Sequence, residues 1–95
     1  ACLASRIPFG TPVTRELLAQ IERAEEVLHE QGFAHCRVRH HGDIARIELA
    51  ARDMPRLLDP ILRGQIAQGL RAAGYRYVTL DLQGYRMGSL NEKDQ

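Results

Sequence analysis

The chain has 95 residues, of which 44% are hydrophobic and 26% are charged, and its formal net charge is +1. This composition is typical of one small globular domain, because a chain of this length buries roughly 60–65% of its unfolded surface. The near balance of charges gives no indication of nucleic-acid binding, and no apolar run approaches the roughly 20 residues of a membrane span. Two cysteines supply neither a disulfide framework nor a zinc quartet, so we expect reduced thiols and a cytoplasmic location.

The first 13 residues, ACLASRIPFGTPV, are interrupted by two prolines and a glycine and are predicted to form a loop. From chemistry alone, Cys2 is either an incidental loop cysteine or a thiol whose thiolate is stabilised by Arg6. Because the chain begins at Ala1 within a loop-like segment, we expect it to be part of a longer protein.

A helix is predicted between Thr14, a typical N-cap, and Gly32, which suits a left-handed helix end with Phe33 as its hydrophobic contact. Apolar residues recur between them at helical spacing: Leu17, Ile21, Ala24 and Leu28. The polar side carries side chains that usually form a solvated stripe and less often a metal patch: Glu22, Glu25, Glu26 and His29.

Residues 35–49, HCRVRHHGDIARIEL, alternate in polarity and predict a β-hairpin with Gly42 and Asp43 at a type II′ turn. A slip of one residue would send the apolar side chains to opposite faces, so the register is well determined. The expected pairs are Cys36 with Leu49 and Val38 with Ile47 on the buried face, and Arg37 with Glu48 and Arg39 with Arg46 on the outer face.

Several hairpin residues could carry chemistry. The outer arginines either pair with Glu48 and Asp81 on a solvated face or bind an anion such as phosphate, and the residues alone favour the solvated face. His40 and His41 point to opposite faces of a strand and cannot easily share a metal ion, so we interpret them as turn histidines. Cys36 alternates inward and is predicted to be a buried core thiol.

A second helix is predicted after two candidate N-caps, Asp53 and Asp59, of which the second precedes Pro60. It ends at Gly74, and its expected apolar stripe is Leu58, Leu62, Ile66, Gly69 and Ala73. A third strand follows in YRYVTLDL, with inward Val78, Leu80 and Leu82 and outward Tyr77, Thr79 and Asp81.

A weak internal repeat relates the two halves of the chain at a constant offset. Its pairs are Leu28 with Leu70, Gly32 with Gly74, Phe33 with Tyr75, Cys36 with Val78, Val38 with Leu80 and Gly42 with Gly84. The alternative to a true repeat is that a helix followed by a glycine, an aromatic residue and a strand is a common local arrangement in proteins. Either way we predict an α+β domain over residues 14–84, in which an α-β-β-α-β order packs a three-stranded sheet against two helices. Residues 85–95 are predicted to be a C-terminal tail.

Three segments in order, CLASRIPFGTPVT, RVRHHGDIARIE and YRYVTLDLQGYRMGSLNE, resemble the C-terminal region of the LarE family. These are ATP-dependent sacrificial sulfur transferases of the PP-loop superfamily. The resemblance implies that a carboxylate of a nicotinic-acid-derived mononucleotide is adenylated and that a cysteine attacks the acyl-adenylate. Its C–S bond then breaks, which leaves sulfur on the product and dehydroalanine in the protein. The product leads towards the nickel-pincer nucleotide cofactor of lactate racemase.

The resemblance assigns the first segment to sulfur donation. Cys2 matches the sacrificial sulfur donor, which belongs on a mobile loop, here residues 1–13, because it must reach substrate held by another part of the protein. Ser5 and Arg6 match the SR of the family motif and would position a phosphate or the thiolate.

The resemblance also assigns residues of the hairpin and the first helix. Arg37 and Arg39 match the family's basic pair near the nucleotide phosphate, which changes our interpretation of the arginine cluster from solvated face to anion site. Glu48, and less closely Glu25, resemble carboxylates that are associated with a metal site in the family, so a divalent metal is expected there.

Nothing like the SGGxDS-type loop of the PP-loop domain is present in the chain. We therefore expect ATP and Mg to bind an N-terminal domain outside this chain, which alone should be inactive. The implied partners are a nucleotide-like substrate and further copies in a homo-oligomer, with no nucleic acid and no membrane. Some members use an iron–sulfur cluster instead, but two cysteines make the sacrificial route simpler. The competing hypothesis is a non-enzymatic α+β module that binds an anionic small molecule or mediates oligomerisation.

Overall fold

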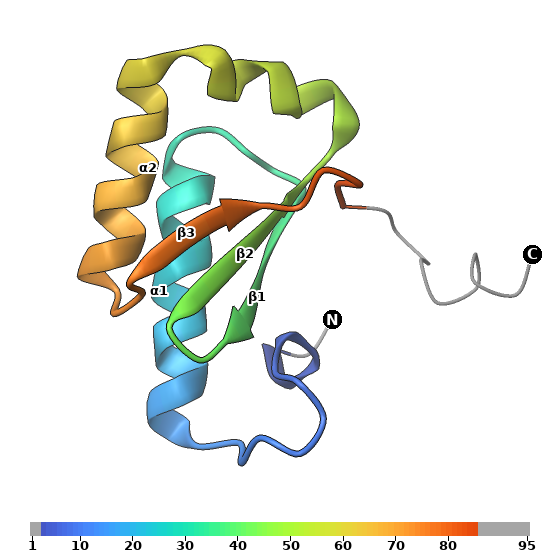
Figure 1. The fold of residues 1–95 in the computed structure, drawn as a ribbon, viewed down its shortest axis with the longest axis vertical. Coiled ribbons are helices and arrows are strands. Elements are labelled where there is room, and N and C mark those ends of the chain that lie inside the picture. Colours follow the sequence, from blue (N-terminus) through green and yellow to red (C-terminus); the bar gives the residue numbers. More distant parts are fainter. Residues whose placement is uncertain (1–2, 86–95) are drawn as a thin grey trace, which may run out of the picture.

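A computed structural model describes residues 3–85 of the chain (Figure 1). Its elements in chain order are the 3-10 helix η1 (Leu3–Arg6), α1 (Arg15–Glu30), β1 (Cys36–His41), β2 (Ile44–Leu49), the 3-10 helix η2 (Ala51–Leu58), α2 (Pro60–Ala72) and β3 (Tyr77–Leu80). The predicted α+β fold with its three-stranded sheet is confirmed, and the two 3-10 helices add to it. No helix in the described part of the chain is long and apolar enough to cross a bilayer.

The sheet has the order β1-β2-β3, with β1 and β2 antiparallel and β2 and β3 parallel. The parallel pair requires a crossover, which η2 and α2 provide. Both long helices lie on one side of the sheet, and η1 lies near the hairpin on the other side (Figure 1). The core between helices and sheet contains Ala24, Leu28, Phe33, Val38, Ile47, Leu49, Ile66, Leu70 and Tyr75.

Helix α1 begins at the predicted cap, because the Thr14 hydroxyl accepts a hydrogen bond from the N–H of Leu17 at 3.1 Å. Beyond its end, Gly32 has a φ of 93° and the Phe33 N–H donates to the Leu28 carbonyl at 3.1 Å. The second half repeats this ending: Gly74 has a φ of 116°, and the Tyr75 N–H donates to the Leu70 carbonyl at 3.1 Å. The internal repeat therefore has a structural counterpart at both helix ends.

The hairpin register is confirmed at every predicted pair, with Arg37 opposite Glu48 and Val38 opposite Ile47. Gly42 has a φ of 59°, whereas the φ of Asp43 is not positive, because positive φ values within residues 3–85 occur only at glycines. This pattern fits the predicted type II′ turn, which needs a positive φ at its first central residue only. The predicted inner face is buried in full: Cys36, Val38, Ile47 and Leu49.

The interpretation of His40 as a turn histidine is wrong. The alternation that buries Val38 continues to His40, which is only 7% exposed, and its Nδ1 lies 2.8 Å from the Tyr75 hydroxyl. His41 points to the other face and is exposed, as the strand period of two requires. Burial of its ring lowers the pKa of His40 below 6.5, and the neighbouring His41 lowers it further.

Two predicted inward residues are instead on the surface. Leu58 is 78% exposed because it is the last residue of η2 and precedes Asp59, the N-cap of α2. Leu82 is 84% exposed because β3 already ends at Leu80. The apolar stripe of α2 is carried by Ile66 and Leu70, with Ala73 buried directly after the helix.

Both chain ends differ from the expected loop and tail where the structure describes them. Within the predicted loop of residues 1–13, residues 3–6 form η1 and Arg6 is buried. Mobility of the rest of that segment stays a prediction, and Cys2 lies outside the described residues. Of the predicted tail, Tyr85 donates its N–H to the Leu49 carbonyl at 2.7 Å, and the positions after it lie outside the described residues.

Two glycines of α2 test how tightly the helices pack. A Cβ at Gly69 would lie 2.7 Å from Cγ1 of Val27 on α1, whereas a Cβ at Gly64 would meet nothing within 4 Å. Both Gly→Ala changes gain the same helix propensity, so their difference isolates the packing cost. We expect Gly64→Ala to stabilise by about 0.5–1 kcal/mol and Gly69→Ala to be about 1–3 kcal/mol less stable than Gly64→Ala, measured by urea unfolding. Equal stabilities would contradict this helix contact.

The buried His40 predicts how the free energy of unfolding depends on pH. Because its folded pKa is lowered, the unfolded chain binds the proton more tightly below pH 6.5. Stability should be level above about pH 6.5 and fall below it, by at most about 1.4 kcal/mol per pH unit from this group. Urea unfolding of His40→Gln should show a shallower fall, whereas Tyr75→Phe should keep the wild-type slope at lower overall stability. Identical slopes for His40→Gln and wild type would refute the assignment.

Candidate functional site

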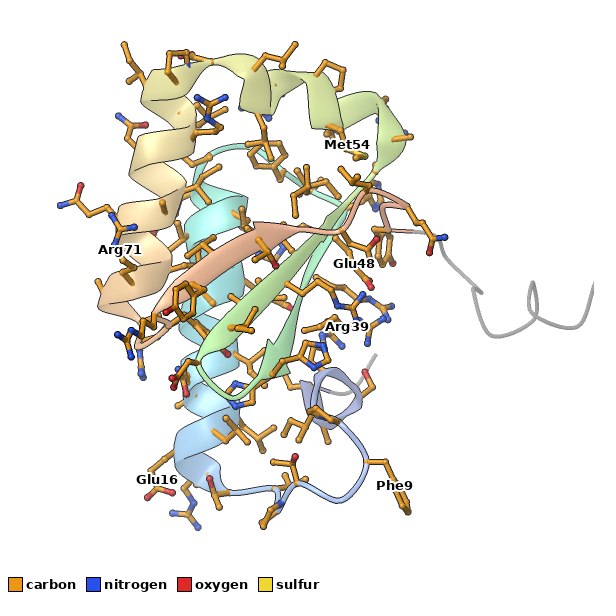
Figure 2. All side chains as sticks on the ribbon, in the orientation of Figure 1. Phe9, Glu16, Arg39, Glu48, Met54 and Arg71 are labelled. Atoms are coloured by element: carbon orange, nitrogen blue, oxygen red, sulfur yellow. The ribbon has the colours of Figure 1, made fainter. Side chains whose placement is uncertain are left out.

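The outer face of the hairpin gathers four charged side chains, which we call the arginine face: Arg37, Arg39, Arg46 and Glu48. Alternation along β1 and β2 points them to one side, and Figure 2 shows Arg39 and Glu48 above η1. A hollow of about 280 Å³ lies between this face and the N-terminal segment, lined by Ser5, Arg6, Ile7, Pro8, Arg39, His41, Arg46 and Glu48. Four predicted site residues thus meet here, namely Ser5, Arg6, Arg39 and Glu48, and Arg37 lies beside them.

Glu25 fastens the N-terminal turn to the sheet. Its Oε2 accepts from Arg6 Nε at 2.9 Å and from the Val38 N–H at 2.9 Å, and its Oε1 accepts from Arg6 Nη2 at 3.3 Å. Strand β1 is at the edge of the sheet, so the carboxylate replaces a missing strand partner. The expected solvated stripe is correct for Glu22, Glu26 and His29 and wrong for Glu25, which η1 buries.

Glu48 organises two of the arginines. Its Oε1 pairs with Arg39 Nε at 3.2 Å, and its Oε2 pairs with Arg46 Nη1 at 3.2 Å. Arg46 also pairs with Asp81 on the loop after β3, and Arg39 donates from Nη1 to the Ser5 carbonyl at 3.0 Å. The carboxylates therefore hold both guanidinium groups in place, and Arg39 joins the sheet to η1.

Arg37 is held in a different way. Its guanidinium carbon lies 4.8 Å from the centroid of the Tyr85 ring, and its Nη2 donates to the Tyr85 hydroxyl at 3.4 Å. Among residues 3–85 it has no carboxylate partner, although Glu48 is directly opposite on β2. Four arginines, counting Arg6, thus face three carboxylates, and the described site retains one positive charge.

His41 is a member of the site that the turn interpretation missed. Its Nε2 accepts from Arg46 Nε at 3.3 Å. Although the residue is exposed, partial desolvation of its ring lowers its pKa below 6.5, and the guanidinium groups of Arg46 and Arg39 lower it further. The same alternation that places Arg39 outward was the available signal for His41.

Only one of the two cysteines, Cys36, lies within the described residues. Cys2, the predicted sulfur donor, lies outside the described residues. Cys36 is buried, as predicted, and donates its thiol proton to the Phe33 carbonyl at 3.5 Å. Burial raises the pKa of Cys36 to about 12, with a further contribution from Glu25. Cys36 is therefore a protonated thiol and a poor nucleophile at neutral pH.

The carboxylates predicted for a metal site are occupied by other partners. Both oxygens of Glu25 and both of Glu48 accept from arginines. Within residues 3–85 no group of three or more His, Cys, Asp and Glu side chains is arranged to hold a metal ion. A metal at Glu48 would therefore need ligands from outside this range.

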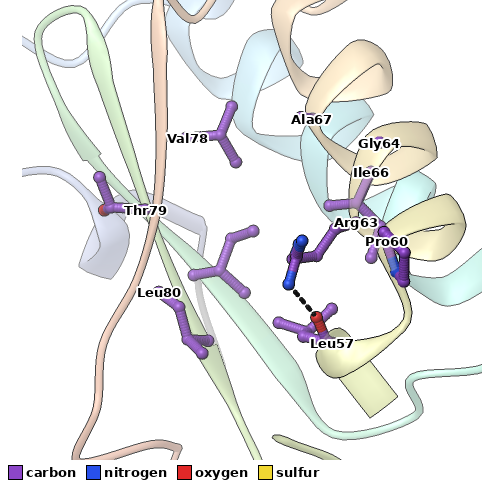
Figure 3. A pocket seen from close by; sticks show the side chains of 10 residues that line it. Leu57, Pro60, Arg63, Gly64, Ile66, Ala67, Val78, Thr79 and Leu80 are labelled. Atoms are coloured by element: carbon purple, nitrogen blue, oxygen red, sulfur yellow. Dashed lines mark hydrogen bonds between the residues drawn. The ribbon is translucent and has the colours of Figure 1, made fainter. Parts of the chain in front are cut away.

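A second hollow, of about 390 Å³, lies between α2 and β3 (Figure 3). Its lining is mainly apolar, and the charged residue in it is Arg63, whose Nη1 donates to the Leu57 carbonyl at 3.3 Å. None of the predicted site residues lies in it. The cluster of arginines that the sequence predicted as an anion site lies on the arginine face and not in this hollow.

Fold and site together define a small α+β domain with an arginine-rich outer face. No family model matches the chain. Similar proteins include the pyridinium-3,5-bisthiocarboxylic acid mononucleotide synthase of Lactiplantibacillus plantarum, 42% identical over 90 residues, and an uncharacterized protein of Synechocystis sp., 40% identical over 90 residues. Each match covers 95% of this chain but only 32% and 34% of the relatives, so the chain spans about one third of their length. The synthase match confirms the resemblance to the LarE family.

The buried pair of Arg6 and Glu25 should be the main attachment of the N-terminal turn. Glu25→Gln removes the carboxylate that pairs with Arg6 at 2.9 Å while the guanidinium stays buried, which should cost about 3–5 kcal/mol of unfolding free energy. Trypsin should then cleave after Arg6 faster than in the wild type. Glu26→Gln, an exposed neighbour on the same helix, is the matched control and should change stability by less than about 0.5 kcal/mol. Similar effects of the two substitutions would contradict the anchoring role.

Proposed function

We propose that the chain is the part of an ATP-dependent sulfur transferase that carries the sulfur donor, Cys2. Its acceptor would be an adenylated pyridinium carboxylate mononucleotide in nickel-pincer nucleotide biosynthesis. The observation that carries the proposal is the attachment of η1, the turn that directly follows Cys2 in the sequence. The pair of Arg6 and Glu25 and the bond from Arg39 to Ser5 fasten that turn beside the arginine face.

The chemistry divides into two steps. The thiolate of Cys2 attacks the carbonyl carbon of the acyl-adenylate, which forms a thioester and expels AMP. A base then removes the Cα proton of Cys2, and the Cβ–S bond breaks with its electron pair leaving on sulfur. The product is a thiocarboxylate, and the residue that remains is dehydroalanine.

The arginine face supports the proposal through its charge. Guanidinium groups bind phosphate by paired, charge-assisted hydrogen bonds, and a nearby cation also favours a thiolate. Arg37 has no carboxylate partner in the described range and would contact the phosphate, whereas Arg39, paired with Glu48, would orient η1. Ser5 accepts from Arg6 Nη1 at 3.2 Å and belongs to the same turn.

The remaining requirements would be met outside this chain. We propose that ATP and Mg bind a further domain, that the chain alone does not catalyse the reaction, and that the full-length protein is a homo-oligomer. A free thiol donor fits the reducing cytoplasm, which is the location we propose.

The decisive variant is Cys2→Ala in the full-length protein, supplied with ATP and substrate. It should abolish sulfur transfer and leave adenylation intact, because only the nucleophile is removed. In the wild type, one turnover should lower the mass of the tryptic peptide that ends at Arg6 by about 34 Da, the mass of hydrogen sulfide lost from cysteine.

Cys36 provides the internal control, because trypsin places it in a different peptide, residues 24–37. That peptide should keep its mass, and Cys36→Ala should keep transfer activity if the variant is folded. Sustained turnover with Cys2 unmodified would refute the sacrificial mechanism and leave an external donor or a cluster as the sulfur source.

A further inference from the structure

Tyr85 supplies both described contacts of Arg37. The guanidinium carbon is 4.8 Å from the ring centroid, well inside the roughly 6 Å range of cation–π attraction. The hydrogen bond to the phenol oxygen is 3.4 Å long, beyond the usual 2.7–3.2 Å, so it is the weaker contact. The face of the ring is therefore what holds Arg37.

The backbone conformation at Gly84 and Tyr85 places the Tyr85 ring next to Arg37. Gly84 has a φ of 80°, a conformation that favours glycine, and a Cβ on it would lie 2.8 Å from the Leu49 carbonyl oxygen. That same oxygen accepts the Tyr85 N–H at 2.7 Å. This turn carries the chain from β3 across the end of β2 and delivers the Tyr85 ring to Arg37 on β1.

A ring and a carboxylate hold an arginine with different consequences. Glu48 fixes Arg39 and Arg46 but neutralises charge as it does so. An aromatic face fixes a guanidinium and leaves its charge uncompensated. We propose that Tyr85 is a positioning residue that keeps the charged guanidinium of Arg37 in place beside the hollow, where it binds the phosphate of the substrate. This inference rests on the proposed function and adds to it the residue that makes Arg37 available.

The test is a titration of the chain with inorganic phosphate and with nicotinic acid mononucleotide, followed by NMR at the Nε–Hε group of each arginine. Arg37→Gln should weaken binding by about tenfold, and Tyr85→Leu should weaken it by a similar factor. Tyr85→Phe, which keeps the ring, should stay within about twofold of the wild type. The double variant Tyr85→Leu with Arg37→Gln should bind no more weakly than Arg37→Gln alone, because both changes remove the same contact.

The matched control is Tyr77 on β3, whose ring lies 5.6 Å from the guanidinium carbon of Arg76, away from the hollow. Tyr77→Leu should leave phosphate affinity unchanged. The wild-type chain gives a second readout that needs no variant: ¹⁵N relaxation should show the Arg37 Nε–Hε group to be more ordered than that of the exposed Arg71.

The outcomes separate the two proposals. Wild-type affinity in Tyr85→Leu, multiplying effects of Tyr85→Leu and Arg37→Gln, or an Arg37 as mobile as Arg71 would each overturn the role of Tyr85. If Arg37→Gln loses binding while Tyr85→Leu keeps it, the proposed function stands and only the role of Tyr85 is refuted. Conversely, a wild-type chain that binds neither probe while Arg37 is ordered would contradict the proposed use of the arginine face and support the holding of Arg37 by Tyr85.

Discussion

The arrangement of this domain depends on the hydrogen bonds and the ion pair that the carboxylate of Glu25 makes. Glu25 lies in α1 and is buried, yet it binds Arg6 on η1 and the edge N–H of Val38 on β1. A buried charge is tolerated only when partners replace its lost hydration, and here each partner comes from a different element. Helix, sheet edge and N-terminal turn therefore depend on one another. The same charge also helps to raise the pKa values of Cys36 and Tyr75.

Part of the arrangement of the arginine face depends on that attachment. With η1 fastened beside the hairpin, its Ser5 carbonyl accepts from Arg39, and Arg39 shares the Glu48 carboxylate with Arg46. Both oxygens of Glu25 and both of Glu48 thus hold arginines within residues 3–85. Arg37 is held by an aromatic ring and has no carboxylate partner within residues 3–85, so no ion pair there compensates its charge. The proposed anion site would combine two carboxylate-paired arginines with Arg37, which an aromatic ring holds.

Local patterns in the sequence predicted the framework well. Thr14, Gly32 and the register of Arg37 with Glu48 were correct because capping, left-handed helix ends and alternation depend on neighbouring residues. Element ends were less certain, and Leu58 and Leu82 fell just outside the helix and strand to which they were assigned.

The errors at the site share one cause. Glu25 was predicted to be solvated and His40 to lie in a turn. Both are instead buried against partners that are far away in the sequence, Arg6 and Tyr75. Likewise nothing near Arg37 in the sequence indicates Tyr85. Which buried polar group meets which partner is decided by packing between elements, and the period of a single strand or helix does not contain that information.

The fastened N-terminal turn is the feature on which the proposed function depends most, and the steady-state ¹H–¹⁵N NOE of backbone amides measures its order directly. Residues 3–6 should give values as high as those of α1, because buried ion pairing and a hydrogen bond to the sheet hold them. Values should drop after Pro8, where Phe9 is fully exposed and a Cβ at Gly10 would meet nothing within 4 Å. Low or negative values across residues 3–6 would show that the turn moves freely, and would contradict the claim that Glu25 holds the segment after Cys2 beside the arginine face.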